Sequence, residues 1–575
     1  MPRLRFTLAL STALVLPAAA RAADTVQELK GQVPMDSLEH FFVAFDVPPG
    51  TREIEIAHDD LSDDNILDWG LVDPRGVFRG WGGGNGENAV VGEAAATRSY
   101  LPGAIAPGTW SVVVGKAKIA APPGEYEITV TLRDAPTLAP QPERAPYQPA
   151  ALGGEPRWYA GDFHVHSRDS GDASPSLDVI AGFARGRGLD FVVVTDHNTT
   201  SHLDFFADAQ ARHPDLLFVP GCEFTTYAGH MNAIGATAWV DHKLGQPGVT
   251  ITAAADAYDL QGAVLSANHP ALALGDLCIG CAWELDLDPA RLGAVEIATG
   301  GLDKAGMFFT DDAMRFWDDL CDAGHHPAPL GGSDDHKGGV DLGGFDSPIG
   351  DPTTLVYADT LGVDAILAGL RAGRTVVKLQ GPGDPMLELS SGTHVPGDTF
   401  DADLATLKVR VTGAPAGAGV RLVRDRWPLD AVPVAGDPFE HEFTVEPPEA
   451  GRSRWRAEVL VDGAPRTVTN HLWIGRPSTE SPTTGDATTD APMTGPDSTA
   501  SSDTDPASTS AGATPSETGC GCRSVAPPSP VLLALLLLRR RRSPAPRESH
   551  VQKGRFTSSP ALATTCPSGH STARP

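Results

Sequence analysis

Cysteine is scarce in this chain, and the sequence has no long uninterrupted apolar run. Seven cysteines in 575 residues are too few for a disulfide scaffold. The apolar run from Val531 to Leu538 is shorter than the roughly 20 residues that cross a bilayer as a helix. The sequence also contains no GxSxG nucleophile elbow and no phosphate-binding P-loop, so it offers no motif for serine-hydrolase or P-loop chemistry.

Basic residues are outnumbered by acidic ones. The chain has 44 Lys and Arg against 73 Asp and Glu, which gives a net charge of −29. A protein that binds duplex DNA or RNA needs a basic face, so this balance argues against a nucleic acid duplex as partner. A small phosphate ester is still compatible with the charge, because metal ions offset negative charge locally.

The N-terminus has the pattern of an export signal. Arg3 and Arg5 precede an apolar stretch, and Ala20-Arg21-Ala22 fits a cleavage site. We therefore expect residues 1–22 to be a signal peptide. The exported protein would be secreted or held at the cell surface or outer envelope, where disulfides are allowed. An isolated CxxC at Cys278 and Cys281 predicts a local disulfide or buried thiols, with a structural zinc as the alternative.

The C-terminal part has the composition of a linker and an attachment tail. Residues 476–518 are mostly Ser, Thr, Pro, Asp, Gly and Ala, which predicts disorder. In residues 519–542, two cysteines, an apolar run and four arginines follow one another. This order resembles the C-terminal sorting tails of myxobacterial surface proteins and implies attachment to the cell envelope, with residues 543–575 as a disordered extension. A weak tail anchor held by the arginines is the alternative.

Two regions have the alternating apolar pattern of antiparallel sheets. Residues 23–135 and 385–475 contain short alternating segments separated by Gly and Pro, which predicts a β-sandwich in each. Residues 136–156 contain several prolines and are expected to be a linker. The expected strands are 41–45, 51–56, 110–114 and 126–132 in the first sandwich and 407–411, 443–445, 455–461 and 467–473 in the second.

Residues 157–384 alternate apolar runs with helical stretches. This alternation predicts an α/β domain whose parallel sheet is covered on both faces. Ser174 suits a helix N-cap and Pro175 the first helical position. The apolar face expected for this helix is Leu177, Ile180, Ala181 and Ala184, and the expected strands are 191–194, 217–219, 263–265 and 294–297.

His, Asp and Glu residues fall at the ends of these apolar runs. His164 and His166 lie two apart on an extended segment, so both imidazoles point to the same side. Active sites of barrel-like α/β domains lie at the carboxyl ends of strands, so candidates that follow separate strands are expected to meet. The nine candidate ligands are His164, His166, Asp172, His197, Glu223, His230, His269, Asp334 and His336.

Imidazole and carboxylate are ligands for Zn, Mn and Fe, so the set predicts a centre with more than one divalent ion. Metal ions in a water-exposed pocket generate hydroxide at neutral pH, which indicates hydrolysis. Asp169 competes with Asp172 as the acid of the loop, and a salt bridge is the alternative role for Glu223. Asp196 is expected to orient a ligand without binding metal itself.

The motifs around these residues resemble those of the PHP (polymerase and histidinol phosphatase) superfamily. They are HVHS at 164–167, TDH at 195–197, GH at 229–230, NHP at 268–270 and SDDH at 333–336. Within the superfamily, GHMNAIG at 229–235 and GGSDDH at 331–336 are similar to the carbaryl-hydrolase-like (CehA/McbA-type) metallohydrolases. In the family Ser-Asp-Gly often follows HxHS, whereas here the acid, Asp172, is displaced by one residue.

The resemblance covers about residues 157 to 380 and implies a distorted (β/α)7 barrel with two or three metal ions, flanked here by the two sandwiches. It also implies three ligand sets. They are His164, His166, Glu223 and Asp334 for one ion, Glu223, His230 and His269 for a second, and Asp172, His197 and His336 for a third.

The sequence thus predicts a metal-dependent hydrolase acting on a small-molecule substrate. A hydroxide bridging two ions would cleave a phosphoester, or a carbamate or aryl ester. The alternative is a surface binding module in which the sandwiches bind the ligand and the metal is purely structural. A structural zinc closes with four ligands, whereas this chain offers nine, which favours the hydrolase.

Overall fold

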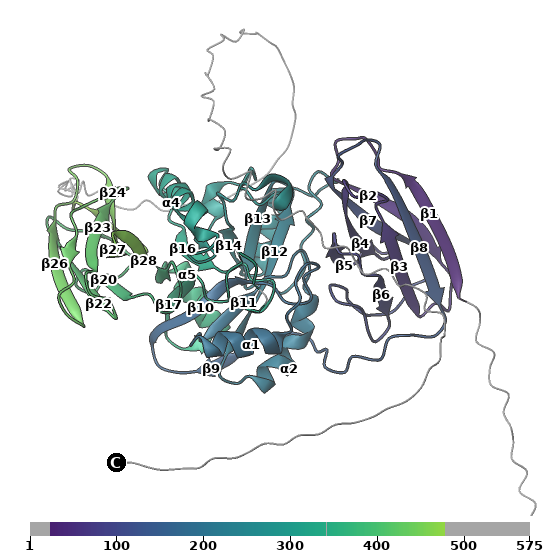
Figure 1. The fold of residues 1–575 in the computed structure, drawn as a ribbon, viewed down its shortest axis with the longest axis horizontal. Coiled ribbons are helices and arrows are strands. Elements are labelled where there is room, and N and C mark those ends of the chain that lie inside the picture. Colours follow the sequence, from purple (N-terminus) through teal and green to yellow (C-terminus); the bar gives the residue numbers. More distant parts are fainter. Residues whose placement is uncertain (1–23, 341, 345, 478–575) are drawn as a thin grey trace, which may run out of the picture. The chain divides into compact units, whose positions relative to one another are not determined.

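The computed structural model describes residues 24–340, 342–344 and 346–477. The expected signal peptide and the tail from residue 478 onward lie outside the described residues. The described part is multidomain and mostly β (Figure 1), and all of it falls within one compact unit.

The N-terminal region consists of two four-stranded antiparallel sheets that form two layers (Figure 1). One sheet has the strand order β1-β8-β3-β6 and the other β2-β7-β4-β5. Apolar side chains of both sheets, among them Ile54, Trp110 and Ile128, share one core. The strands are β1 (Thr25–Gln32), β2 (His40–Val47), β3 (Glu53–Asp59), β4 (Ile66–Val72), β5 (Phe78–Gly83), β6 (Ala89–Gly92), β7 (Gly108–Lys118) and β8 (Glu125–Arg133).

The segment 136–156, predicted as a linker, packs against its neighbours. Its strand β9 (Ala151–Gly153) pairs antiparallel with β18 (Leu361–Gly362) of the central domain. Nη1 of Arg144 donates to Oδ2 of Asp204 at 2.9 Å. These contacts make the segment a fixed connection between the first sandwich and the central domain.

The central sheet is mixed, which corrects the prediction of a parallel sheet. Strands β10, β11 and β12 pair in parallel, and so do β14, β15 and β16. Strand β13 is antiparallel to both of its neighbours. Only Tyr227 and Ala228 separate β12 from β13, and a two-residue hairpin cannot reach a parallel position. Among the described residues the strand path is open and no closed barrel is formed, so the (β/α)7 barrel is not confirmed.

The central strands are β10 (Arg157–Val165), β11 (Phe191–Val194), β12 (Leu217–Thr226), β13 (Gly229–Ile234), β14 (Val264–Ala267), β15 (Ala294–Thr299), β16 (Ala328–Gly332), β17 (Thr353–Ala358) and β19 (Thr375–Lys378). The helices are α1 (Leu177–Gly186), α2 (Phe206–Arg212), α3 (Ile251–Leu260), α4 (Gly306–Asp322) and α5 (Val363–Arg371). None of the helices in the described ranges has the length and apolar character needed to span a membrane.

Helix α1 follows the loop that contains the candidate ligand Asp172, and its predicted apolar face is buried as expected. Its N-cap is Ser176 and not Ser174, because the Ser176 hydroxyl accepts a hydrogen bond from the Val179 N–H at 3.3 Å. The Ser174 N–H donates instead to the carbonyl of His336 at 3.0 Å. That bond holds residue 174 against the loop after β16, so the helix begins later than predicted.

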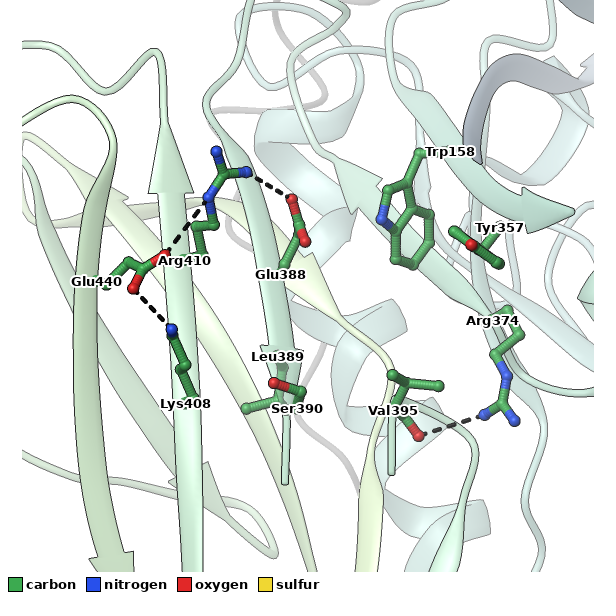
Figure 2. A pocket seen from close by; sticks show the side chains of 10 residues that line it. All are labelled: Trp158, Tyr357, Arg374, Glu388, Leu389, Ser390, Val395, Lys408, Arg410 and Glu440. Carbon is green, nitrogen blue, oxygen red and sulfur yellow. Dashed lines mark hydrogen bonds and ion pairs between the residues drawn. The ribbon is translucent and has the colours of Figure 1, made fainter. Parts of the chain in front are cut away.

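The C-terminal region adds a second pair of layers with a core of its own. Strands β20, β22 and β26 form one antiparallel sheet, and β28 pairs with β19, which extends the central sheet into this region. Figure 2 shows a pocket that this three-stranded sheet lines together with Trp158, Tyr357 and Arg374 of the central domain. On the sheet side of the pocket, Lys408 pairs with Glu440 and Arg410 with Glu388. The strands are β20 (Met386–Ser390), β21 (Thr399–Asp401), β22 (Ala405–Thr412), β23 (Gly419–Arg424), β24 (Trp427–Pro428), β25 (Val432–Pro433), β26 (Phe439–Val445), β27 (Arg452–Val461), β28 (Ala464–Thr469) and β29 (Leu472–Gly475).

Aromatic rings and two buried histidines fill the contact between the N-terminal sandwich and the central domain. Phe78 of β5 stacks on Trp239 with ring centroids 4.1 Å apart, and the ring of His40 lies 5.6 Å from that of His242. Burial lowers the pKa of His40 to about 4 and that of His242 well below its usual range. Both imidazoles are therefore neutral at pH 7, and the contact is uncharged at these two positions.

Acid should destabilise this contact. The unfolded chain takes up a proton on His40 near pH 6.5, whereas the folded protein does so only near pH 4. The free energy of unfolding is therefore at its full value above pH 6.5. It decreases as the pH falls toward 4, by about 3 kcal/mol for His40 alone. Urea unfolding between pH 4.5 and 7.5 should show a shallower pH dependence in His40→Phe than in the wild type. Equal slopes would contradict this assignment.

Candidate metal centre

The nine candidate ligands converge at one end of the central strands. His164 is the penultimate residue of β10, Glu223 and His230 lie on the hairpin strands β12 and β13, and His269 follows β14. The Nε2 atoms of His164 and His166 are 3.1 Å apart. Because β10, β11 and β12 run in parallel, their ligand-bearing ends meet at the same edge of the sheet.

Glu223 is at the centre of the cluster and is fully buried. Its Oε1 lies 3.4 Å from Nε2 of His164, 3.3 Å from Nδ1 of His230 and 3.4 Å from Nε2 of His269. Its Oε2 lies 2.7 Å from Nδ1 of His197. Burial alone would raise the pKa of Glu223, but the surrounding histidines hold it well below its usual value. The carboxylate is therefore ionised and faces five imidazoles, because its Oε2 also lies 3.5 Å from Nε2 of His166.

Asp334 connects the HxH pair to the loop after β16. Its Oδ1 lies 3.3 Å from Nε2 of His164, 3.1 Å from Nε2 of His166 and 3.7 Å from Nδ1 of His336. The backbone joins the same segments, because the Asp334 N–H donates to the carbonyl of His164 at 2.9 Å. Asp334 has a φ of 55° and His269 a φ of 30°, which are strained conformations for residues other than glycine. Such strain is concentrated at functional sites in proteins.

Asp172 lies between the two remaining imidazoles. Its Oδ2 is 3.4 Å from Nε2 of His197 and 3.3 Å from Nε2 of His336. Asp169, the competing acid of the same loop, points elsewhere. It accepts hydrogen bonds from the Ser99 N–H at 3.3 Å and from the Ser201 hydroxyl at 2.8 Å. The structure therefore places Asp172 with the ligands, and Asp169 in the contact with the first sandwich.

Two further acids hold the backbone around the cluster. Asp196 accepts hydrogen bonds from the N–H and the hydroxyl of Ser167, both at 2.6 Å, and so fixes the residue that follows His166. Asp335 faces away from the ligands and accepts from the N–H groups of Lys337 and Gly339.

Glu296 was not predicted from the sequence, although it contacts two of the ligands. Its Oε1 lies 2.8 Å from Nδ1 of His164, and its Oε2 accepts the His269 N–H at 2.9 Å. A carboxylate at Nδ1 keeps the proton there and leaves Nε2 free to bind metal. The available signal was an acid in the middle of the buried strand β15, where an unpaired charge would be costly. Gly332 makes room for this contact, because a Cβ there would overlap His164 and lie 2.8 Å from Glu296 Oε1.

The donor set fits divalent cations. Burial lowers the pKa of His166 to about 4, so this imidazole is neutral and has a lone pair to offer. Within the described residues, both ring nitrogens of His230 are buried without a well-formed hydrogen bond. Buried nitrogen and oxygen acceptors that face one another at 3–3.5 Å are satisfied by a shared cation.

Four triads of donor atoms lie within 4.8 Å of one another. They are His166, His197 and His336; His230, His269 and Cys281; His164, His269 and Asp334; and His164, His166 and Glu223. Cys281 forms the predicted disulfide with Cys278, so its sulfur offers no thiolate, and we assign it no ligand role.

A cavity of about 390 Å³ opens onto the cluster. Its lining residues belong to the loops that carry the candidate ligands, to the first sandwich and to the loop after β14. They include Asp172, His197, His230, His269, Asp334 and His336, together with Ile66, Asp68, Trp81, Tyr227, Leu277 and Ile279. The described lining residues include no Lys and no Arg.

No protein-family model and no curated protein matches the chain. Among solved structures, it aligns with a two-domain protein from Bacteroides vulgatus that contains a predicted PHP-like metal-dependent phosphoesterase. The identity is 19%, the alignment covers 57% of this chain and 99% of that chain, and the TM-score is 0.34. A candidate metal-dependent phosphoesterase from Bifidobacterium adolescentis aligns at 14% identity over 33% of this chain and 91% of that chain, with a TM-score of 0.24.

An amidohydrolase from Chromobacterium violaceum aligns at 16% identity over 32% of this chain and 93% of that chain, with a TM-score of 0.22. Identities and TM-scores this low leave the chemistry of the chain to be argued from its own donor geometry.

Replacing Glu223 by Gln should reduce metal binding, because it removes the charge around which the imidazoles gather. We expect elemental analysis of the desalted variant to find at most about half of the wild-type divalent metal. The rise in Tm on adding Zn or Mn should shrink accordingly, since metal stabilises only the folded state that binds it. Glu458→Gln removes another buried carboxylate, paired with Arg421 in the second sandwich, and should leave the metal content unchanged. An unchanged metal content in Glu223→Gln would contradict the central role of this residue.

Proposed function

We propose that this chain is a metal-dependent hydrolase of small-molecule esters. The observation that carries the proposal is the convergence of six imidazoles and three carboxylates at one cavity. A structural zinc is closed by four ligands and leaves no coordination position for a substrate. A cluster with more than twice that number of donors, several of them lining a cavity, favours hydrolysis over a purely structural metal.

Three donor sets would hold the ions, and the first two share Glu223. His164, His166, Glu223 and Asp334 would hold one, Glu223, His230 and His269 a second, and Asp172, His197 and His336 a third. Divalent ions in such a site lower the pKa of water and stabilise negative charge on oxygen.

The protein supplies fixed ring orientations to this site. The carbonyl of Cys281 lies 2.9 Å from Nδ1 of His269, and the carbonyl of Asp334 lies 2.9 Å from Nδ1 of His336. A carbonyl oxygen only accepts, so both rings carry their proton on Nδ1 and present Nε2 as a ligand. Glu296 acts in the same way on His164. These partners orient three of the six rings before any ion binds.

The charge of the cavity favours a carboxyl or carbamate ester over a phosphoester. Proteins usually grip phosphate with Arg or Lys, and the described lining residues include neither. Asp68 adds further negative charge to the wall, whereas the charge of Asp276 is paired with Lys118. A phosphoester is the second candidate, and the metal ions alone would have to offset its charge.

We also propose the finer fold and location that the sequence suggests. The backbone hydrogen bonds between the end of β10 and the segment after β16 support a distorted barrel of the CehA/McbA type.

The Cys278–Cys281 disulfide supports an exported protein that works in an oxidising compartment. Envelope attachment through residues 519–542 stays a prediction from the sequence.

The double variant His164→Ala with His166→Ala should abolish hydrolysis while the fold persists. We expect the rate to fall by more than the roughly 10–100-fold that follows loss of an outer partner of a metal ligand. The assay is a panel of aryl esters, aryl carbamates, phosphomonoesters and phosphodiesters with Zn, Mn and Fe, and circular dichroism monitors the fold. His325→Ala with His326→Ala removes two histidines outside the cluster and should stay active. Full activity in the first variant would rule out the proposed centre.

A further inference from the structure

We propose that the N-terminal sandwich completes the substrate cavity, and that Asp68 and Tyr227 form a subsite there for a hydroxyl or N–H group of the substrate. The inference rests on the proposed hydrolytic function and adds to it a class of substrate: esters with an apolar part that carries a hydrogen-bond donor.

Asp68 and Tyr227 come from different domains and meet at the cavity wall. Asp68 lies on β4 of the sandwich, and Tyr227 lies in the turn between β12 and β13. The Tyr227 hydroxyl donates to Oδ2 of Asp68 at 2.6 Å, and both residues line the cavity of the metal centre. A polar pair that belongs to two domains is thus directed at the space in front of the ligands.

The pair presents hydrogen-bond acceptors to the cavity. Burial and the neighbouring Asp68 raise the pKa of Tyr227 well above its usual value, so the hydroxyl keeps its proton and directs it to Asp68. No described residue donates a hydrogen bond to Oδ1 of Asp68. A Cβ at Gly84 would lie 3.3 Å from this oxygen, so the glycine leaves the space beside Oδ1 free. A carboxylate oxygen with space beside it and no donor suits a substrate hydroxyl or N–H.

Apolar side chains line the same cavity. Ile66 of the sandwich and Leu277 and Ile279 of the loop after β14 contribute to its wall, and Leu277 is 54% exposed. Nζ of Lys118 on β7 forms an ion pair with Oδ2 of Asp276 at 2.7 Å, which joins the loop to the sandwich. Ligand sites combine apolar walls with a few convergent polar groups in this way.

Close backbone contacts fix the sandwich in place. A Cβ at Gly171, beside the ligand Asp172, would overlap the carbonyl of Gly82 on β5. A Cβ at Gly115 of β7 would overlap the hydroxyl of Tyr227. Only glycine allows the backbone to come this close at both positions. The sandwich wall of the cavity is therefore an integral part of the site, and Asp68 has a defined position within it.

Binding of 4-ethylphenol and of its methyl ether, 4-ethylanisole, to the metal-free protein tests the subsite apart from catalysis. The two probes have the same apolar ring, but only the phenol donates a hydrogen bond. Calorimetry should show that the wild type prefers the phenol by about 10-fold or more, the size of effect expected for a hydrogen bond to a charged group. Asp68→Asn places an amide donor at the subsite, and Gly84→Ala covers Oδ1 without changing Asp68. Both should lower the preference to about twofold or less.

Matched controls separate the subsite from general damage to the sandwich. Asp46→Asn makes the same change on β2 of the same sheet, away from the cavity lining, and Gly86→Ala adds a methyl where no atom lies within 4 Å. Both should keep the wild-type preference. A wild type that does not discriminate between the probes, or Asp68→Asn and Gly84→Ala variants that discriminate as well as it does, would overturn the subsite.

Turnover distinguishes failure of the subsite from failure of the proposed function. Hydrolysis of aryl esters with equal kcat/KM for hydroxyl- and methoxy-bearing rings would contradict the subsite and leave the hydrolase intact. A preserved preference for the phenol in a protein that hydrolyses no ester would contradict the proposed function and leave the binding site intact.

Discussion

A buried carboxylate surrounded by imidazoles is the constraint on which the central domain depends. Glu223 is fully buried, and rings from four other segments approach its oxygens to between 2.7 and 3.4 Å. A lone carboxylate would be costly at such a position, so each of those segments must bring its ring to the same point. The backbone around the cluster is strained at His269 and Asp334, and Gly332 leaves room for the contact between His164 and Glu296.

The two sandwiches relate to this centre in different ways. The C-terminal one continues the central sheet, because β28 pairs with β19, and none of its residues is among the described residues that line the cavity at the cluster. The N-terminal one reaches the cavity with Asp68 and packs on Tyr227 of the β12–β13 turn. The first arrangement extends the central sheet beyond β19, and the second gives the site part of its shape.

Local patterns in the sequence predicted those strands and helix faces that depend only on residues close together in the chain. The strand at 191–194 and the buried face of α1 follow directly from apolar spacing. The candidate ligands were selected because imidazole and carboxylate recur after apolar runs. The antiparallel strand β13 was missed because its ligand-bearing sequence was interpreted as a motif and not as the second arm of a hairpin.

Contacts between residues that are far apart in the sequence could not be predicted in this way. Glu296 binds His164 across 132 positions, and Asp68 binds Tyr227 across 159. No local periodicity marks such pairs, because the contact exists only once the sheet and the sandwich are assembled. An acid within an apolar strand was the one usable sign, and it marks both Glu296 on β15 and Asp68 on β4.

Anomalous diffraction from crystals soaked in Mn tests the central claim most directly. We predict at least two peaks within the cluster, with an oxygen of Glu223 roughly 2.0–2.3 Å from two of them and imidazole nitrogens completing each site. A cluster without any peak, or a single ion closed by four ligands and remote from Glu223, would contradict it.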